Sequence, residues 1–456
     1  MRDRVIRYAF VLLVALGISG PCPRPLAVQA PNPTGHYEQV SGIRLVCLQG
    51  DPYEMGLQQG TLFREPLREL VRDYLYQRIV FERGVSHSWL LAYARLSERD
   101  VPSDLQREMQ GIADGAGLSY QDVLLLNTVP DLLALTYGLP AWDLSPTLFS
   151  TAKQSATILQ STASRHPSGG TLSCATFAVW GSATTGGGLL VGHNLDSAEA
   201  DLLGHYLLVV VRQPSQGNAF VSVGLMGMVG VWTGMNEGKL TVTLSSSPSV
   251  DVASSGQPLP FVLRRVLEHA GDLSEALHVL LAADRLCGGN VVLGDGKAPE
   301  AIAVELSAHR HAVFEADAES EPLARTNHFL DPDLELAQRD VLSGQERAAS
   351  QARLNRLQAL LEFNRGWMGA DKGLALLRDE HDARFNDAMV YGPYTLQSVL
   401  FHPERLTLWV AQGQVLRSSA QGRVLRSLPQ GGGTTPLESY VNLALTALPS
   451  ECPGNR

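Results

Sequence analysis

Residues 171–182 of this chain are Thr171-Leu172-Ser173-Cys174-Ala175-Thr176-Phe177-Ala178-Val179-Trp180-Gly181-Ser182. Small polar residues lead into an apolar run of β-branched and aromatic residues, which predicts a strand that begins at Cys174. A cysteine there is either a small buried hydrophobic residue or a nucleophile exposed by cleavage of the bond before it. In the second case the chain cuts itself between Ser173 and Cys174, and the new α-amino group becomes the base that activates the thiol.

The segment before this strand has the composition of an exposed loop. Residues 151–170 are rich in Ser, Thr and Ala and end with His166-Pro167-Ser168-Gly169-Gly170. A solvent-exposed segment can be cut without disturbing a core, and the same composition is also typical of an ordinary loop.

The pattern of apolar residues divides the chain at about this point. Residues 50–127 carry apolar residues at helical spacing, and Ser119-Tyr120-Gln121-Asp122 is typical of a helix start. After Cys174 the pattern predicts short strands, then helices at 261–267 and 274–281, strands again, helices at 348–361 and 372–377, and final strands. This order predicts two sheets between helical layers.

Composition limits the class of partner. The chain has 456 residues, of which 45% are hydrophobic and 18% charged, and its formal net charge is −10. These values predict a soluble globular protein and argue against nucleic acid, which would need a basic face.

The first thirty residues predict an export signal. Arg2, Arg4 and Arg7 precede the apolar run from Tyr8 to Ile18, and small residues lie near Ala30. We therefore expect residues 1–30 to direct the chain to the periplasm or the outside of the cell. Cleavage at Ala27 and retention of the segment as an anchor stay open as alternatives.

The cysteines predict no metal site. There are five, and no pair has the close spacing of a zinc knuckle. In an exported chain at most one disulfide can form among Cys47, Cys287 and Cys452 if Cys174 is spared.

A second strand with an acidic end follows Cys174. The segment Gly188-Leu189-Leu190-Val191-Gly192-His193-Asn194-Leu195-Asp196 is one hairpin further along the chain. Antiparallel pairing would bring Asp196 near Cys174, where a carboxylate can orient the amine. The alternative is that Asp196 only caps a turn.

These two segments together resemble the catalytic start of N-terminal nucleophile hydrolases. More narrowly, they resemble the peptidase C45 family of self-cleaving acyltransferases and hydrolases, which includes the acyl-coenzyme A:6-aminopenicillanic acid acyltransferases. Further matching motifs bring the resemblance to nearly all of the chain after residue 36; they are at residues 50–60, 126–132, 234–238, 326–329 and 395–401.

The resemblance implies a fold and a domain division. The fold is α+β, a four-layer αββα sandwich with an N-terminal helical segment. Residues 36–173 form that segment, which becomes the first chain after self-cleavage, and residues 174–456 form the catalytic core.

The resemblance also implies the catalytic residues. Cys174 is the nucleophile, its freed amino group is the base, Asp196 supports that amine, and Asn327 donates to the oxyanion. A neutral amide donor suits this last role because it does not compete for the proton. The alternative for Asn327 is a turn before Pro332.

Substrate-binding positions are expected at His193, Asn236 and Ser245. Relatives usually carry Arg where this chain has His193, which replaces a permanent charge with a group that titrates near pH 6.5. Bile-salt hydrolases carry Asn about where this chain has Ser245-Ser246. The downstream arginine of the family is either Arg353 or Arg356.

We therefore expect an exported, self-processing cysteine amidohydrolase or acyltransferase. It would act on a small-molecule amide, at a linear C–N bond in a non-peptide or short-peptide substrate, with no cofactor, and its two processed chains would stay associated. The alternatives are a weakened acyl-amide binding protein on the same scaffold and a dipeptidase.

Overall fold

The computed structural model describes residues 35–137, 173–315, 322–380, 389–392, 394–411 and 440–444. Its N-terminal part contains β1 (His36–Val40), β2 (Ile43–Gly50), α1 (Pro52–Leu62), α2 (Arg64–Leu70), the π-helix η1 (Val71–Glu82), α3 (His87–Glu98), α4 (Ser103–Ala116) and α5 (Tyr120–Leu135). Residues 1–30 and 138–172 lie outside the described residues, so the expected signal segment and the expected loop before Cys174 do too.

The part after the proposed cut contains most of the strands. They are β3 (Ser173–Gly181), β4 (Gly187–Asp196), β5 (Leu207–Pro214), β6 (Phe220–Leu225), β7 (Thr233–Asn236), β8 (Leu240–Ser246), β9 (Gly289–Asp295), β10 (Glu300–Leu306), β11 (His311–Glu315), β12 (Leu323–Arg325), β13 (Thr395–His402), β14 (Thr407–Ala411) and β15 (Tyr440–Ala444). The helices are α7 (Ala200–Leu203), α8 (Leu259–His269), α9 (Leu273–Ala282), α10 (Pro332–Gln338), α11 (Gly344–Phe363) and α12 (Ala370–Leu377), with short 3₁₀ turns at Gly204–Tyr206 and Pro403–Arg405.

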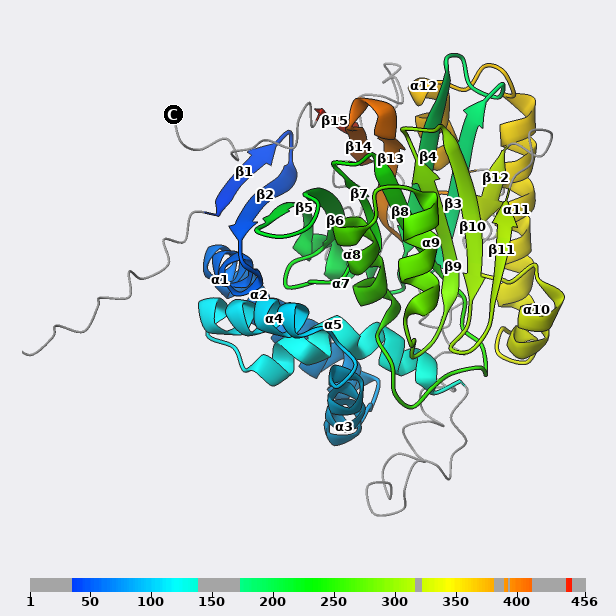
Figure 1. The fold of residues 1–456 in the computed structure, drawn as a ribbon. Coiled ribbons are helices and arrows are strands. Elements are labelled where there is room, and N and C mark those ends of the chain that lie inside the picture. Colours follow the sequence, from blue (N-terminus) through cyan, green and yellow to red (C-terminus); the bar gives the residue numbers. More distant parts are fainter. Residues whose placement is uncertain are drawn as a thin grey trace, which may run out of the picture. The chain divides into compact units, whose positions relative to one another are not determined.

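The described strands form two sheets (Figure 1). Sheet A has the order β1-β2-β5-β6-β7-β8-β9-β10-β11, and sheet B has the order β12-β3-β4-β13-β14-β15. One core cluster joins the inner faces of both sheets, for example through Val191, Val223 and Phe401. A second joins sheet A to α8 and the N-terminal helices, and a third joins sheet B to α11 and α12. The layers are therefore αββα, and the α+β fold class predicted from the sequence is confirmed.

The hairpin of β3 and β4 places the cysteine between the sheets. Side chains of a strand alternate between its two faces. Phe177 on β3 packs with α11 and α12, whereas Cys174 belongs to the core on the sheet A side. Thr176, two residues after Cys174, contacts Ser245 of sheet A. Cys174 and Thr176 therefore face sheet A.

The N-terminal segment is part of sheet A as well as a helical layer. Strand β2 pairs in parallel with β5, with Leu45 opposite Val209. Helix α1 begins with a capping box between Asp51 and Glu54, and α5 begins at Ser119, whose side chain accepts from the Asp122 amide as the sequence pattern predicted. The prediction of a purely helical segment therefore missed β1 and β2.

Helices α1 and α4 pack very closely through glycines. A Cβ atom added to Gly56 would lie 2.0 Å from the Glu108 carbonyl oxygen, and one added to Gly111 would lie 2.2 Å from the Tyr53 carbonyl oxygen. Only residues without a side chain permit this approach. The position of α4 on α1 is thus fixed by backbone contact.

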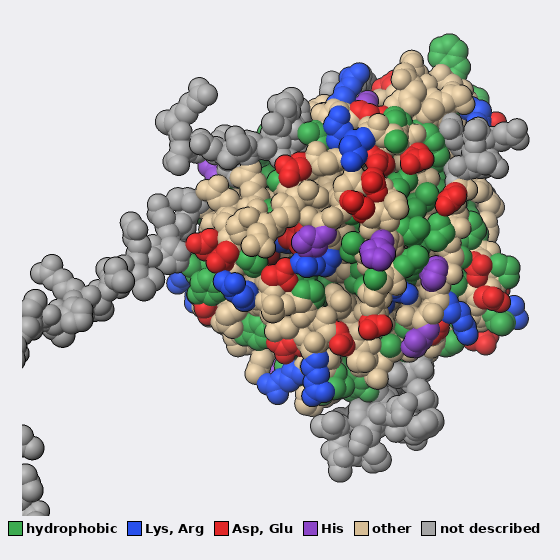
Figure 2. Space-filling model, in the orientation of Figure 1, with side chains coloured by type: hydrophobic (Ala, Val, Ile, Leu, Met, Phe, Trp, Pro, Cys, Tyr) green, Lys and Arg blue, Asp and Glu red, His purple; other side chains and the backbone are tan. Residues whose placement is uncertain are grey.

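The charges visible on the surface are mixed in sign. Figure 2 shows acidic and basic side chains interspersed over the face in view, which is the face of Figure 1. Within the described ranges, no helix has both the length and the apolar character that crossing a membrane requires.

Candidate active site around Cys174

Cys174 lies one residue inside β3, directly opposite Leu195 of β4. It is 1% exposed. The strand begins at Ser173, so the predicted start at Cys174 was late by one residue. Cys174 and Ser173 are thus held in regular β structure, with the peptide bond between them at the beginning of the hairpin.

Asn327 holds the backbone amide of Cys174. The Cys174 N–H donates to Asn327 Oδ1 at 2.8 Å, and Arg353 Nη2 donates to the same oxygen at 2.7 Å. Asn327 Nδ2 donates to the Ser246 carbonyl at 2.8 Å. Because both partners of Oδ1 are donors and the partner of Nδ2 is an acceptor, the orientation of this amide follows from its neighbours.

This geometry gives Asn327 a contact that the sequence reasoning did not foresee. In the uncut chain its oxygen binds the nitrogen that would become the α-amine, and its NH₂ group donates to a backbone carbonyl. These contacts place the side chain of Asn327 directly against the backbone nitrogen of Cys174. The predicted role as oxyanion donor stays a prediction.

Asn327 is itself held by helix α11. Its backbone N–H donates to Ser350 Oγ at 3.0 Å, and Ser350 precedes Arg353 by about one helical turn. The Arg353 residue is 3% exposed. Arg356 instead forms a bidentate pair with Asp379 at 2.6 and 2.8 Å, and its side chain is 32% exposed. Of the two arginines left open by the sequence, Arg353 is therefore the one beside Cys174.

Asp196 ends β4 opposite Ser173, so the predicted antiparallel pairing does bring it beside the peptide bond before Cys174. It also lies opposite Thr395 of β13 and is 7% exposed. Its negative charge disfavours a thiolate at Cys174. A carboxylate at this position is suited to stabilise a positively charged amine.

Burial holds the Cys174 thiol in its protonated form. It raises the pKa of Cys174 to about 11, against smaller lowering effects from the Ser246 backbone, Arg353 and Asn327. The thiol of the uncut chain is therefore almost wholly protonated at neutral pH. Nucleophilic attack needs a group that accepts this proton.

Ser245 and Ser246 form the sheet A side of the site. Ser245 Oγ is 3.2 Å from Thr176 Oγ1, and Thr176 is the neighbour of Cys174 on the same face of β3. Ser246 contributes its backbone: its carbonyl accepts from Asn327, and its backbone hydrogen-bonds with Cys174. The predicted residue Ser245 is therefore at the site, where its hydroxyl contacts Thr176 rather than the thiol itself.

His193 lies opposite Thr176, so it is the diagonal neighbour of Cys174 on the same face of sheet B. Its Nδ1 is 2.5 Å from Thr233 Oγ1, which also accepts from Gln397 Nε2 at 2.9 Å. Burial lowers the pKa of His193 to about 3, against a smaller raising effect of the Leu244 backbone. His193 is therefore a neutral hydrogen-bonding group at physiological pH.

Asn236 is not brought to this group of residues. Its Nδ2 donates to the carbonyls of Leu267 and Ala270, and its Oδ1 accepts from the Leu240 N–H at 2.9 Å. Leu240 begins β8, whose other end is Ser246, roughly 20 Å away at about 3.3 Å per residue. These contacts fix the β7–β8 turn.

Sequence reasoning missed Thr176, Ser350 and Gln397. Thr176 had a local signal, because a residue two positions after Cys174 on a strand faces the same way. Gln397 lies in the motif at residues 395–401 but was not singled out, and Ser350 had no signal, since the packing of α11 brings it to the site. Within the described residues, no group of three His, Cys, Asp or Glu side chains is arranged to hold a metal ion.

Residues 183–416, just over half of the chain, match the family model described as acyl-coenzyme A:6-aminopenicillanic acid acyl-transferase. The chain belongs to this acyl-transferase family. The family resemblance stated from the sequence is thereby confirmed. The matched residues include His193, Asp196, Asn327 and Arg353, and they begin nine positions after Cys174.

Two curated proteins align with this chain at low sequence identity. The chain is 26% identical over 323 residues to an uncharacterized protein of Archaeoglobus fulgidus, covering 67% of this chain and 50% of that protein. It is 22% identical over 297 residues to protein dcd1B of Dictyostelium discoideum, covering 60% of this chain and 52% of the other. The chain thus spans about half the length of these curated relatives.

Solved structures show weaker likeness. An N-acylethanolamine-hydrolyzing acid amidase ortholog of Caenorhabditis elegans matches with a TM-score of 0.38 and 19% identity, covering 51% of this chain and 93% of that one. A mutant conjugated bile acid hydrolase of Clostridium perfringens matches with a TM-score of 0.37 and 14% identity, covering 52% and 89%. At these TM-scores neither likeness identifies an activity.

Proposed function

We propose that this protein is a self-processing amidohydrolase or acyltransferase whose nucleophile is Cys174. The observation that carries the proposal is the hydrogen bond from the Cys174 backbone N–H to Asn327 Oδ1, an oxygen that Arg353 also binds. The nitrogen beside the thiol is thus already held by the side chain of a distant residue, as an N-terminal amine that works as a base would need to be.

Processing begins with attack of the Cys174 sulfur on the carbonyl carbon of Ser173. The C–N bond between the two residues breaks, the sulfur keeps the acyl group as a thioester, and the nitrogen takes up a proton to become an amine. Water then hydrolyses the thioester, which returns the thiol and leaves a carboxylate on Ser173. Asp196, opposite Ser173, stabilises the positive charge that the amine carries when protonated.

The same groups then act on substrate. The free amine of Cys174 accepts the thiol proton, because an α-amino group titrates near neutrality at about 7.7 to 8.0. The thiolate attacks the amide carbonyl, the amine portion leaves with a proton, and the acyl group passes from sulfur to water or to another amine. Asn327 positions the amine, and backbone or hydroxyl groups at Ser245-Ser246 stabilise the oxyanion.

The substrate is a linear amide whose group near His193 carries no negative charge. This part of the proposal is supported by the burial of His193 and its low pKa, because a neutral imidazole offers no countercharge to a carboxylate. Asn236 serves the core instead of the substrate in this proposal.

The proposal also keeps the predicted location and assembly. Residues 1–30 direct export or anchor the chain, and the fragments that end at Ser173 and begin at Cys174 stay together in one fold. Every strand of sheet B and most strands of sheet A belong to the second fragment.

The test is the intact mass of the purified chain. We expect wild-type protein to yield two fragments, of which one begins at Cys174, and Cys174→Ala to stay uncut. Cys287→Ala is the matched control, because Cys287 is another buried thiol and lies outside the site. An uncut wild-type chain, or a cut Cys174→Ala chain, would refute self-processing.

A second measurement addresses the substrate. Processed protein is mixed with N-acyl amides, bile-salt conjugates, penicillins and dipeptides, and the mass of the second fragment is followed for acyl addition. We expect acylation at Cys174 by neutral N-acyl amides. Processed protein that binds these amides without becoming acylated would favour a binding protein.

A further inference from the structure

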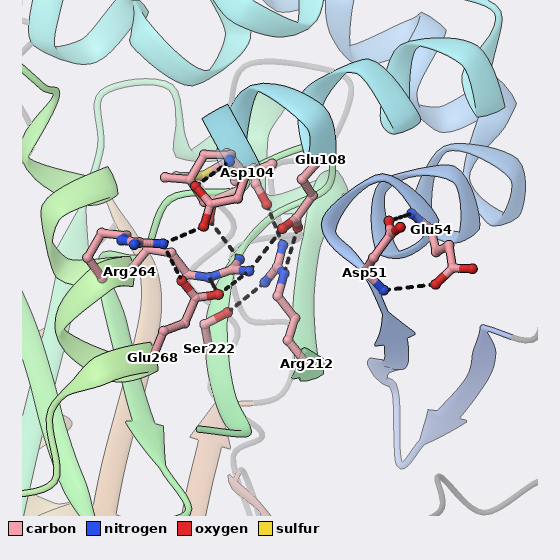
Figure 3. Close-up of polar contacts among 12 residues, drawn as sticks. Asp51, Glu54, Asp104, Glu108, Arg212, Ser222, Arg264 and Glu268 are labelled. Carbon is pink, nitrogen blue, oxygen red and sulfur yellow. Dashed lines mark hydrogen bonds and ion pairs between the residues drawn. The ribbon is translucent and has the colours of Figure 1, made fainter. Parts of the chain in front are cut away.

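A cluster of four charged side chains is buried away from Cys174, where the N-terminal helices meet sheet A. It consists of Glu108 on α4, Arg212 on β5, and Arg264 and Glu268 on α8, and we refer to it as the Glu108 cluster (Figure 3). Glu108, Arg212 and Arg264 are each at most 1% exposed, and Glu268 is 5% exposed. Charged side chains are rarely buried so fully unless they are paired.

Glu108 is the centre of the cluster. Its Oε1 accepts from Arg212 Nε at 3.0 Å, and its Oε2 accepts from Arg264 Nη2 at 2.9 Å. Arg264 Nε also donates to Glu268 Oε1 at 2.8 Å. One carboxylate from α4 therefore neutralises part of the charge of two guanidinium groups.

Further donors of the two arginines bind β6 and the segment between β6 and β7. Arg212 donates to the Met228 carbonyl at 2.6 Å and to Ser222 Oγ at 3.2 Å, and Arg264 donates to the Val229 carbonyl at 3.1 Å. Phe220 lies under both guanidinium groups, 4.6 Å from that of Arg264. The two arginines are thus fixed in place whether or not Glu108 is present.

The members of the Glu108 cluster come from both sides of the proposed cleavage site. Glu108 lies before Ser173, and the other three members lie after Cys174. We propose that the Glu108 cluster retains the N-terminal fragment after cleavage and makes this retention selective for a fragment that supplies a carboxylate at position 108. That the chain is cut naturally rests on the proposed function. The contact of Glu108 with Arg212 and Arg264 is present in the structure whether or not the chain is cut.

The selectivity follows from the cost of leaving buried charges unpaired. Burial lowers the pKa of Arg212 only to about 10, so this guanidinium stays charged at neutral pH. Loss of the Glu108 carboxylate leaves Arg212 with only neutral acceptors in a site without water contact. Breaking a buried ion pair by removing one partner is strongly destabilising, whereas exposed pairs contribute little.

Helix α4 presents Glu108 rigidly. The Glu108 carbonyl faces Gly56 of α1 at a separation that leaves no room for a side chain. Any shift of α4 relative to α1 is therefore opposed by backbone contact. Apolar contacts of the N-terminal helices supply much of the affinity between the fragments, and the Glu108 cluster discriminates between partners.

The test separates retention from self-cleavage. A recognition sequence for a specific protease is inserted at residues 150–165 of the Cys174→Ala chain, which is then cut by that protease, and dissociation of the fragments is measured after dilution at a fixed urea concentration. We expect Glu108→Gln to accelerate dissociation at least about 100-fold. The matched control is Asp104→Asn. Asp104 is also on α4 and pairs with Arg265 of α8, but this pair is partly exposed and Arg265 keeps Glu268 as a partner, so the rate should change less than about 5-fold.

Folding is checked on the uncut chains by circular dichroism before the protease is added. If Glu108→Gln does not fold, Arg212→Lys replaces it, because lysine keeps the charge and loses the Nε–H that donates to Glu108 across the proposed cut; we expect about 10-fold faster dissociation. Rates equal to that of Asp104→Asn for the variant that folds would overturn the proposal. A wild-type chain that never cuts itself would refute the proposed function and leave this result unaffected.

Discussion

The backbone nitrogen of Cys174 and the side-chain oxygen of Asn327, 153 residues apart in sequence, are joined by a hydrogen bond of 2.8 Å. The bond connects the start of β3 with the segment after β12. Through Asn327 the nitrogen is connected further to Arg353 and to the Ser246 backbone. The surroundings of this one nitrogen therefore depend on three distant parts of the chain.

Replacement of Asn327 should slow self-cleavage. Asn327→Ala removes the acceptor of the Cys174 N–H and the donor to Ser246, and we expect cleavage to be about 100-fold slower, the effect of misplacing a reacting group by about 1 Å. Mass spectrometry of chains sampled over time measures the rate. Asn364→Ala is the control, because the Asn364 side chain donates to the Leu360 carbonyl of its own helix; equal rates in the two variants would contradict the assignment.

Replacements of Arg353 and Arg356, both on α11, should differ sharply in their effect on self-cleavage. Arg353→Met removes a charged hydrogen bond to Asn327, worth about 1.5 to 3 kcal/mol, so cleavage should slow by about 10- to 100-fold. Arg356→Met breaks a partly exposed pair with Asp379 and should leave the cleavage rate unchanged. A slower rate in Arg356→Met than in Arg353→Met would reverse the assignment.

Self-cleavage should accelerate with pH. The pKa of Cys174 in the uncut chain is raised to about 11, so the thiolate fraction grows about tenfold per pH unit throughout the range from 6 to 9. If the thiolate is the attacking species, the logarithm of the rate should rise with a slope near 1. Protein kept uncut at low pH and then transferred to each buffer supplies the rates, and a rate that does not depend on pH would exclude this step.

The stability of the protein should contain a contribution from Asp131 that falls as pH rises. Burial raises the pKa of Asp131 to about 6, against hydrogen bonds from the Leu259 backbone and Cys287. Because the folded state binds this proton more tightly than the unfolded state, the contribution is fully present below pH 4 and is lost as pH rises through 6. The free energy of unfolding of the parent should therefore fall by roughly 2 to 3 kcal/mol more than that of Asp131→Asn over this interval.

Urea unfolding of Cys174→Ala and of Cys174→Ala with Asp131→Asn, at pH 4, 5, 6 and 7, measures this difference without interference from cleavage. Asp73→Asn is the control of opposite sign, because a hydrogen bond from Arg72 lowers the pKa of Asp73. Curves that run parallel for Asp131→Asn and its parent would show that Asp131 is not titrating in this interval.

His193 should act without a charge. Its pKa of about 3 keeps the imidazole neutral from pH 5 to 8, so His193→Gln should leave the pH profile of kcat/KM on a neutral N-acyl amide unchanged in shape. We expect kcat/KM to change by less than about tenfold, since glutamine replaces one neutral hydrogen-bonding group with another. An inflection near pH 6.5 that disappears in His193→Gln would show a titrating histidine instead.

The sequence predicted those parts of the fold that have local patterns. The β3–β4 hairpin, the αββα layers and the approach of Asp196 to Cys174 follow from alternation and short connections. Strand β7 was not predicted, although the motif at residues 234–238 overlaps it. Strands β1 and β2 were missed because β2 is stabilised by pairing with β5, which lies more than 150 residues further along the chain.

The candidate site was only partly predictable for a similar reason. Arg353 and Arg356 differ by nearly one helical turn, so they lie on similar faces of α11, and tertiary packing alone separates a residue beside Asn327 from one beside Asp379. Asn327 came from the family resemblance, and its contact with the Cys174 nitrogen depends on side-chain orientation. Asn236 was chosen from the same resemblance, and its contacts with Leu267 and Ala270 belong to the core.

The parallel pairing of β2 with β5 sets an order of events during synthesis. Residues 43–50 leave the ribosome long before residues 207–214, so the N-terminal strand waits for its partner until the chain has grown past Cys174. A cut made earlier would release a fragment whose strand β2 had only β1 to pair with. If the proposed self-cleavage occurs, folding of the nascent chain therefore has to come first, and the appearance of two fragments in a cell extract would report how much of the protein had already completed sheet A.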